Sequence, residues 1–336
     1  TNYEKIVPDN YEKSNIYGVV DALTKLTITD DTDVSAQAFR NISSITEVIF
    51  KKSIKTIGEY AFLNDTGLVS VNFEDGIDIR TISKGMFKDC ISLVMHELPS
   101  SVTKIDSYAF QNCSAKGFDS FSVTDNVTTI NSYAFAGCSS MVSLTYLGET
   151  TISVISEGVF KDCSMLVMTS LPDSIERIEA YAFENDVEIK DFTVSPNVSF
   201  IGNAVFRGTG LVNLTIPFVG EHIDWTSSDN DKAMFGWIFG NNNSSRTTDN
   251  KDFAIVDSLR RVVITDETRI APHAFFNVDM ITYVSLPSTL TEIGEYAFAG
   301  ASALQAVRIM ENIGLTEVKA GVFKDNAKLE GFMLDN

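Results

Sequence analysis

Four cysteines and three histidines are the residues of this sequence with the greatest capacity for chemistry. The cysteines are Cys90, Cys113, Cys138 and Cys163, and each follows a phenylalanine by three residues. A zinc site would use closely spaced Cys-x-x-Cys pairs, which the sequence lacks. A disulfide would need two thiols that point at each other, whereas equivalent side chains in stacked repeats point the same way. Because free cysteine is among the residue types most often buried, we expect a reduced, buried ladder of four thiols.

The histidines do not form a catalytic constellation. His273 stands where other repeats place tyrosine, His96 takes a strand position held elsewhere by aliphatic residues, and His222 has no neighbour at ligand spacing. The metalloprotease, serine-hydrolase and glycine-rich phosphate motifs are also missing. Acid–base or nucleophilic catalysis requires converging groups, so the sequence favours a protein that is not an enzyme and uses no cofactor. The plentiful carboxylates leave a glycosidase-like pair open but without support.

Acidic side chains dominate the charge of the chain, which is −19 over 336 residues. Such a surface repels nucleic-acid phosphates and anionic lipids, so we expect no nucleic-acid partner. Apolar runs are too short for membrane insertion. Oxygen-rich loops at Asp30, Asp31 and Asp33 and at 229–231 hold the ligand type that calcium prefers, but they lack the EF-hand spacing. Calcium binding stays open without support, because Asp and Asn are also ordinary turn residues.

A repeat of 23 or 25 residues must position all of these groups. Its anchor is a phenylalanine, and one long step of 69 residues, from Phe206 to Phe275, is three times 23. Five residues before each anchor stands a β-branched aliphatic residue, and eight residues before it nine of the eleven repeats place another aliphatic residue. The anchors are Phe39, Phe62, Phe87, Phe110, Phe135, Phe160, Phe183, Phe206, Phe275, Phe298 and Phe323.

Each repeat also contains a short strand of the form Leu-x-x-Φ-x-Φ, as in residues 68–73 and 304–309. Alternate apolar residues would point inward and the residues between them outward. One coil cannot cover its own apolar face, so residues 23–336 must stack and share a core as one solenoid. We predict an α/β-type leucine-rich repeat solenoid with short parallel strands on one face. Its coils of 23–25 residues would be mostly β and irregular.

Three parts of the chain depart from the repeat. Residues 1–22 are predicted to cap the first coil, and the segment 218–258 is irregular. Trp237 lies there in an apolar stretch that we expect to replace a missing coil, and Trp225 lies among polar residues as an exposed contact. A binding insertion and a degenerate coil explain the segment equally well. No polar cap follows the last strand, so we expect the natural protein to continue beyond Asn336.

The repeat resembles the BspA-like class of leucine-rich repeats. The signature is Leu-x-x-Φ-x-Φ-Pro, then Φ-x-x-Ile-x-x-x-Ala-Phe-x-x-Cys, and the resemblance covers residues 23–334 apart from 218–258. All of it but the cysteine is present in Leu286, Pro287, Leu290, Ile293, Ala297 and Phe298. The resemblance implies a secreted or cell-attached protein that binds host or matrix proteins.

Outward residues of the predicted strands are small and mixed, so we expect a monomer without a large apolar interface. Arg260, Arg261, Tyr283 and Arg308 stand out against the acidic background and are, with Trp225, the candidate partner contacts. We predict an extracellular, adhesin-like module that contacts host, matrix or neighbouring-cell proteins. The alternative is a structural spacer of a larger surface protein. An enzyme acting on surface glycans comes third, because the motif search supports none.

Overall fold

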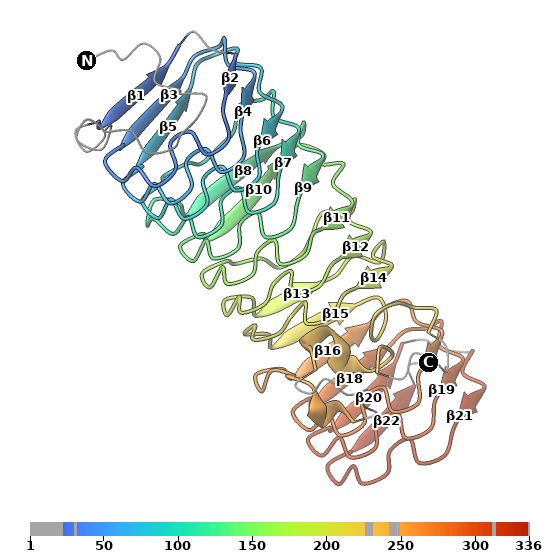
Figure 1. The fold of residues 1–336 in the computed structure, drawn as a ribbon. Coiled ribbons are helices and arrows are strands. Elements are labelled where there is room, and N and C mark those ends of the chain that lie inside the picture. Colours follow the sequence, from blue (N-terminus) through green and yellow to red (C-terminus); the bar gives the residue numbers. More distant parts are fainter. Residues whose placement is uncertain are drawn as a thin grey trace. The chain divides into compact units, whose positions relative to one another are not determined.

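The structure is a computed structural model that describes residues 23–29, 32–225, 231–241, 247, 249–310 and 314–334. The predicted cap at 1–22 lies outside the described residues, as do Asp30, Asp31, Asp229 and Asn230 of the oxygen-rich loops. The chain divides into two compact units, Thr1–Ile152 with Ser156–Leu166 and Ser153–Ile155 with Val167–Asn336. Each unit is a stack of coils with a row of short strands on either side (Figure 1).

The first unit carries its longer strands on one side and two-residue strands on the other. The longer strands form a three-stranded and a two-stranded parallel sheet: β1 (Lys25–Ile28), β3 (Glu47–Phe50) and β5 (Ser70–Phe73), then β8 (Ser120–Thr124) and β10 (Ser143–Leu147). The two-residue strands are also parallel: β2 (Asp33–Val34) and β4 (Thr56–Ile57), then β6 (Thr81–Ile82), β7 (Lys104–Ile105) and β9 (Thr129–Ile130).

The second unit repeats this plan around one long parallel sheet. Its six strands are β13 (Asp191–Thr193), β15 (Asn213–Ile216), β16 (Arg261–Ile264), β18 (Tyr283–Leu286), β20 (Ala306–Ile309) and β22 (Gly331–Leu334). The opposite side has two three-stranded sheets: β11 (Val154–Ile155), β12 (Arg177–Ile178) and β14 (Phe200–Ile201), then β17 (Arg269–Ile270), β19 (Glu292–Ile293) and β21 (Glu317–Val318). Two short 3₁₀ helices, η1 (Phe235–Phe239) and η2 (Asn250–Asp252), precede β16. The predicted repeat solenoid is confirmed.

The anchor phenylalanines form the centre of the core in both units. In the first unit, successive rings from Phe39 to Phe160 lie 5.2–6.1 Å apart and nearly parallel. In the second, Phe183 and Phe206 stack at 6.0 Å, and Phe275, Phe298 and Phe323 continue at 5.0 and 5.7 Å. Each repeat of the sequence therefore adds one ring to a continuous stack of phenylalanines within each unit. Among the residues that the structure describes, no helix has the length and hydropathy of a membrane span.

Each coil turns around its phenylalanine through two residues with positive φ, two positions before it and two after it. Around Phe62 these are Tyr60 (φ 55°) and Asn64 (φ 60°), and all eleven repeats share this feature. Asn, Asp and Gly tolerate this left-handed conformation best, which explains why they fill the second position. Gly85 holds the first position in the next coil, where a Cβ atom would lie 2.3 Å from the Tyr60 ring.

The four cysteines are free and fully buried in the first unit. Each thiol donates to the carbonyl oxygen of the previous coil's phenylalanine over 3.1–3.2 Å, so the thiols form parallel, separate hydrogen bonds. Burial raises the pKa of Cys90, Cys113 and Cys138, which keeps these sulfurs protonated. Asp65 occupies the equivalent position one coil earlier, is also 0 % exposed, and accepts a 2.6 Å hydrogen bond from the Ile42 amide.

Candidate binding surface

The irregular segment of the second unit rebuilds the phenylalanine stack. Phe239 lies 6.5 Å from Phe206, Phe235 lies 5.4 Å from Phe239, and Phe275 lies 4.8 Å from Phe235, all between ring centroids. These three steps account for the gap of three repeat periods, because η1 supplies two rings from one helical segment. The apolar stretch around Trp237 therefore packs into the core in place of missing coils.

Backbone and side-chain hydrogen bonds join this segment to the coils on either side. The Phe206 amide donates to the Ile238 carbonyl oxygen (2.9 Å), and the Phe235 amide donates to the Ala274 carbonyl oxygen (2.9 Å). Asn250 is only 2 % exposed, and its Oδ1 accepts from the Gly236 amide (2.8 Å). Its Nδ2 donates to three carbonyl oxygens of the next coil, at 2.9–3.4 Å. A fully satisfied buried amide of this kind fixes a segment in one position.

Glu267 is a buried acid in a position that belongs to the core. It stands eight residues before Phe275, where nine repeats have an aliphatic residue, and it is 1 % exposed. Oε2 accepts a 3.0 Å hydrogen bond from the Val219 amide of the irregular segment, whereas Oε1 has no hydrogen-bond partner. Burial raises the pKa of Glu267 well above its usual value, and neither the Val219 bond nor the nearby Arg269 charge offsets this. The sequence analysis missed both Glu267 and Asn250. The signal available in the sequence was a glutamate at a repeat position that is otherwise usually aliphatic.

Trp225 lies against β17, on the opposite side of the unit from the six-stranded sheet. Its Nε1 donates to the Arg269 carbonyl oxygen (3.3 Å), and the Arg269 guanidinium carbon lies 4.9 Å from the centroid of the indole ring. The ring is half-buried. The indole that we expected to be exposed therefore makes two contacts within its own chain, and it does not adjoin the other candidate residues.

The remaining candidates gather on or beside the six-stranded sheet. Arg261 on β16 is in register with Tyr283 on β18, and its guanidinium carbon lies 4.8 Å from the tyrosine ring centroid. Arg308 on β20 is exposed and pairs in register with Ser285 of β18. Arg260 directly precedes β16, and its Nη1 donates to the carbonyl oxygens of Asp257 and Leu259. Arg261, Tyr283 and Arg308 thus share one outward face, whereas the Arg260 guanidinium binds the adjoining turn.

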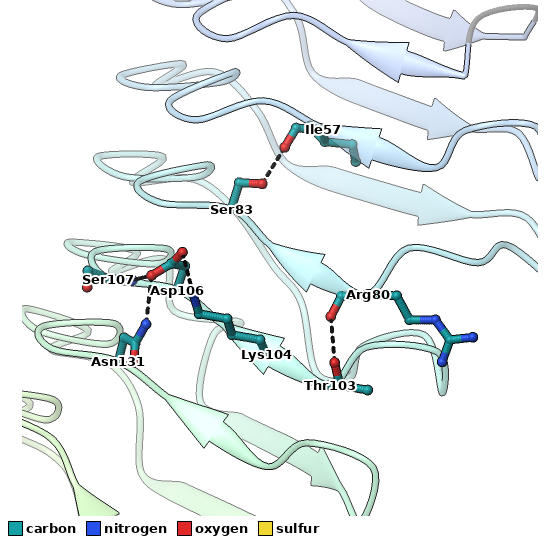
Figure 2. A network of polar contacts seen from close by, with 8 residues as sticks. All are labelled: Ile57, Arg80, Ser83, Thr103, Lys104, Asp106, Ser107 and Asn131. Carbon is teal, nitrogen blue, oxygen red and sulfur yellow. Dashed lines mark hydrogen bonds and ion pairs between the residues drawn. The ribbon is translucent and has the colours of Figure 1, made fainter.

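A polar cluster in the first unit surrounds the Asp106 carboxylate with hydrogen-bond donors. Asp106 accepts hydrogen bonds from the Lys104 ammonium (2.9 Å), the Ser107 amide (2.8 Å) and the Asn131 side chain (2.7 Å) (Figure 2). Burial raises the pKa of Asp106, but these donors outweigh it, so the pKa lies below its usual value. In the same view Ser83 donates to the Ile57 carbonyl and Thr103 to the Arg80 carbonyl. The Asn131, Ser83 and Thr103 side chains join neighbouring coils, whereas Lys104 and Ser107 bind Asp106 within one coil.

Groups of three or more His, Cys, Asp or Glu side chains arranged to hold a metal ion do not occur in the described ranges. Among the candidate residues, Arg261 combines an exposed guanidinium with an aromatic ring on the neighbouring strand.

The sequence model described as BspA type Leucine rich repeat region (6 copies) matches residues 13–119, 115–227 and 241–336. The chain belongs to this family. BspA-type and other leucine-rich repeats serve generally as protein-interaction modules rather than as catalysts. No curated protein matches this BspA-type chain.

Solved structures of leucine-rich repeat proteins are similar to this BspA-type chain. A leucine-rich repeat protein from Bacteroides ovatus is 19% identical, with a TM-score of 0.61 over 99% of this chain and 100% of that one. A leucine rich cell surface protein from Faecalibacterium prausnitzii is 21% identical (TM-score 0.42, 92% and 80% covered). A leucine-rich repeat protein from Eubacterium ventriosum is 18% identical (TM-score 0.46, 95% and 87% covered). The similarity to the Bacteroides protein in fold extends over nearly the whole of both chains.

Proposed function

We propose that this BspA-type solenoid is an extracellular, adhesin-like module that binds proteins of a host, a matrix or a neighbouring cell. The observation that carries the proposal is the pairing of Arg261 with Tyr283 on the outward face of the six-stranded sheet. Arginine and tyrosine are the residue types enriched at the centres of protein interfaces. The extracellular location is what membership of the BspA-type family implies.

The architecture supports recognition by a preformed surface. Parallel strands about 4.8 Å apart hold the outward side chains at fixed spacing, so binding would require little reordering of the backbone. The coil-to-coil hydrogen bonds and the ring stack below the sheet hold that spacing. A repeat surface of this kind contacts a partner by shape and by complementary charge.

The test is a binding screen of the purified chain against immobilised extracellular-matrix and cell-surface proteins at several salt concentrations. Saturable binding that weakens as salt rises supports a recognition module. The matched control is the chain after thermal unfolding, which reports non-specific adsorption by exposed apolar residues. A folded chain that gives no saturable binding to any member of the panel would contradict the proposal and favour a spacer.

A further inference from the structure

Two arginines of the second unit each lie over an aromatic ring on the adjacent strand of their own sheet. Arg177 on β12 lies 3.9 Å from the ring centroid of Phe200 on β14, and Arg261 lies 4.8 Å from that of Tyr283. In both cases the two residues face each other in register on adjacent parallel strands. The ring covers one flat side of the guanidinium and holds it in place. The N–H groups at its edge remain directed away from the ring.

Arg177 shows one group that such a stacked guanidinium binds in this protein. Its Nε and Nη2 both donate to Oε1 of Glu179, each over 3.1 Å. A planar guanidinium presents donors in a fork that matches a carboxylate, and bonds between two charged groups are the stronger kind. The stacked arginine on the β12 side is therefore already paired with an acid of its own chain.

Arg261 has no such acid. Across the described ranges, no carboxylate lies within ion-pair distance of its guanidinium, and its recorded side-chain contact is the Tyr283 ring. The registered neighbour on its other side is Asn213, whose amide donates to Asp191 one strand further. That acid thus already has a partner. Arg261 is exposed, and its guanidinium lies on an aromatic ring without a carboxylate beside it.

We propose that Arg261, held on Tyr283, binds a carboxylate from an acidic segment of a protein partner. This inference rests on the proposed function, since it names the partner chemistry of that surface. The partner's carboxylate takes the place that Glu179 takes on Arg177.

The charge of the molecule favours a short acidic protein segment over a polyanionic chain. A sulfated polysaccharide needs a continuous run of cations, whereas this site offers the Arg261 guanidinium on an acidic molecule that repels further negative charge. One or two carboxylates, followed by neutral residues, fit that arrangement. Binding should weaken as salt rises, because the contact is exposed.

The test uses fluorescein-labelled 12-residue peptides that carry pairs of glutamates at varied spacing, and the same peptides with glutamine at those positions. Their fluorescence anisotropy is measured with the full chain, and a sulfated heparin fragment serves as the competing polyanion. The variants are Arg261→Gln and Arg261→Lys, and the matched control is Arg177→Gln on the other side. Urea midpoints establish that each variant is folded.

We expect glutamate peptides to bind and glutamine peptides not to bind. Arg261→Gln should weaken Kd by about tenfold or more, and Arg261→Lys by a smaller factor because lysine lacks the planar fork. Arg177→Gln should leave Kd unchanged. The inference is overturned if no glutamate peptide binds, if glutamine peptides bind equally, if Arg261→Gln binds like the parent, or if the heparin fragment binds more tightly than every peptide.

The two proposals fail in different ways. A protein from the extracellular panel that still binds Arg261→Gln with parental affinity leaves the recognition module standing and removes the carboxylate site. Glutamate peptides that bind through Arg261, together with a silent panel, keep the site and remove the proposed class of partner.

Discussion

The ring of Phe235 lies 4.8 Å from the ring of Phe275, with 24° between their planes, and this contact sets a residue of the irregular segment inside the core stack. Phe235 is 0 % exposed. Phe235→Ala should therefore lower the free energy of unfolding by about 3–5 kcal/mol, because it opens a cavity in a packed stack. Urea unfolding followed by tryptophan fluorescence is a suitable measurement, since both tryptophans lie in this segment. The control is Phe276→Ala, at a half-buried neighbour, and an equal loss in both variants would contradict the assignment.

Glu267 should make the second unit less stable as pH rises. Burial raises its pKa well above the usual value of 4.5, so the folded state holds the proton that the unfolded chain releases. The stability due to the neutral carboxyl is complete below about pH 4.5 and is lost as pH rises through the folded pKa. Glu267→Gln keeps an oxygen for the Val219 amide and cannot ionise. The urea midpoint of the variant minus that of the parent should increase between about pH 5 and about pH 9. A difference that does not change with pH would refute this prediction.

Asp65 should have a similar effect in the first unit. Burial raises its pKa to about 8, even though the Ile42 amide favours the charged form. Stability from the protonated side chain is present below about pH 3.8 and disappears as pH rises through about 8. Hydrogen exchange at the Ile42 amide should accelerate between about pH 4 and about pH 8 by more than the intrinsic chemistry explains, and this extra acceleration should level off above about pH 8. Asp65→Asn should abolish the extra acceleration, and the amide of Glu74, a partly exposed residue whose carboxyl has a lowered pKa, is the internal control.

The cysteine ladder predicts a thiol titration with two distinct results. The native chain should not react with a thiol reagent, because all four sulfurs are buried and the pKa is raised for Cys90, Cys113 and Cys138. The chain unfolded in guanidinium should yield four thiols. Two thiols, or none, in the unfolded chain would mean that the sulfurs had been oxidised to disulfides.

The sequence predicted those parts of the fold that depend on periodicity. Residues equivalent to Phe62 and Ile57 occur at a fixed spacing in every coil, because stacking places equivalent residues against equivalent neighbours. The left-handed residues Tyr60 and Asn64 recur equally regularly, and the Asn, Asp and Gly at the second position were a readable signal. Periodic features are predictable because each coil sees the same surroundings.

The rest depends on contacts that occur once. Arg260 and Arg261 look alike in the sequence, but the strand begins at Arg261, so one guanidinium binds a turn and the other lies on the sheet. Trp225 appeared exposed among polar residues, yet its indole reaches a carbonyl oxygen of β17. No spacing rule predicts the partner of Glu267, because Val219 belongs to a stretch without the repeat. Singular contacts need the three-dimensional structure.

The irregular segment has a geometric consequence for the second unit. On the sheet side β15 pairs directly with β16, with no strand between them, whereas on the side of η1 two extra phenylalanine rings separate Phe206 from Phe275. The six-stranded sheet is therefore continuous across the irregular segment, while the ring stack beneath it gains two rings. A core segment of unequal length can thus be added to the solenoid without interrupting the row of outward side chains to which Arg261 belongs.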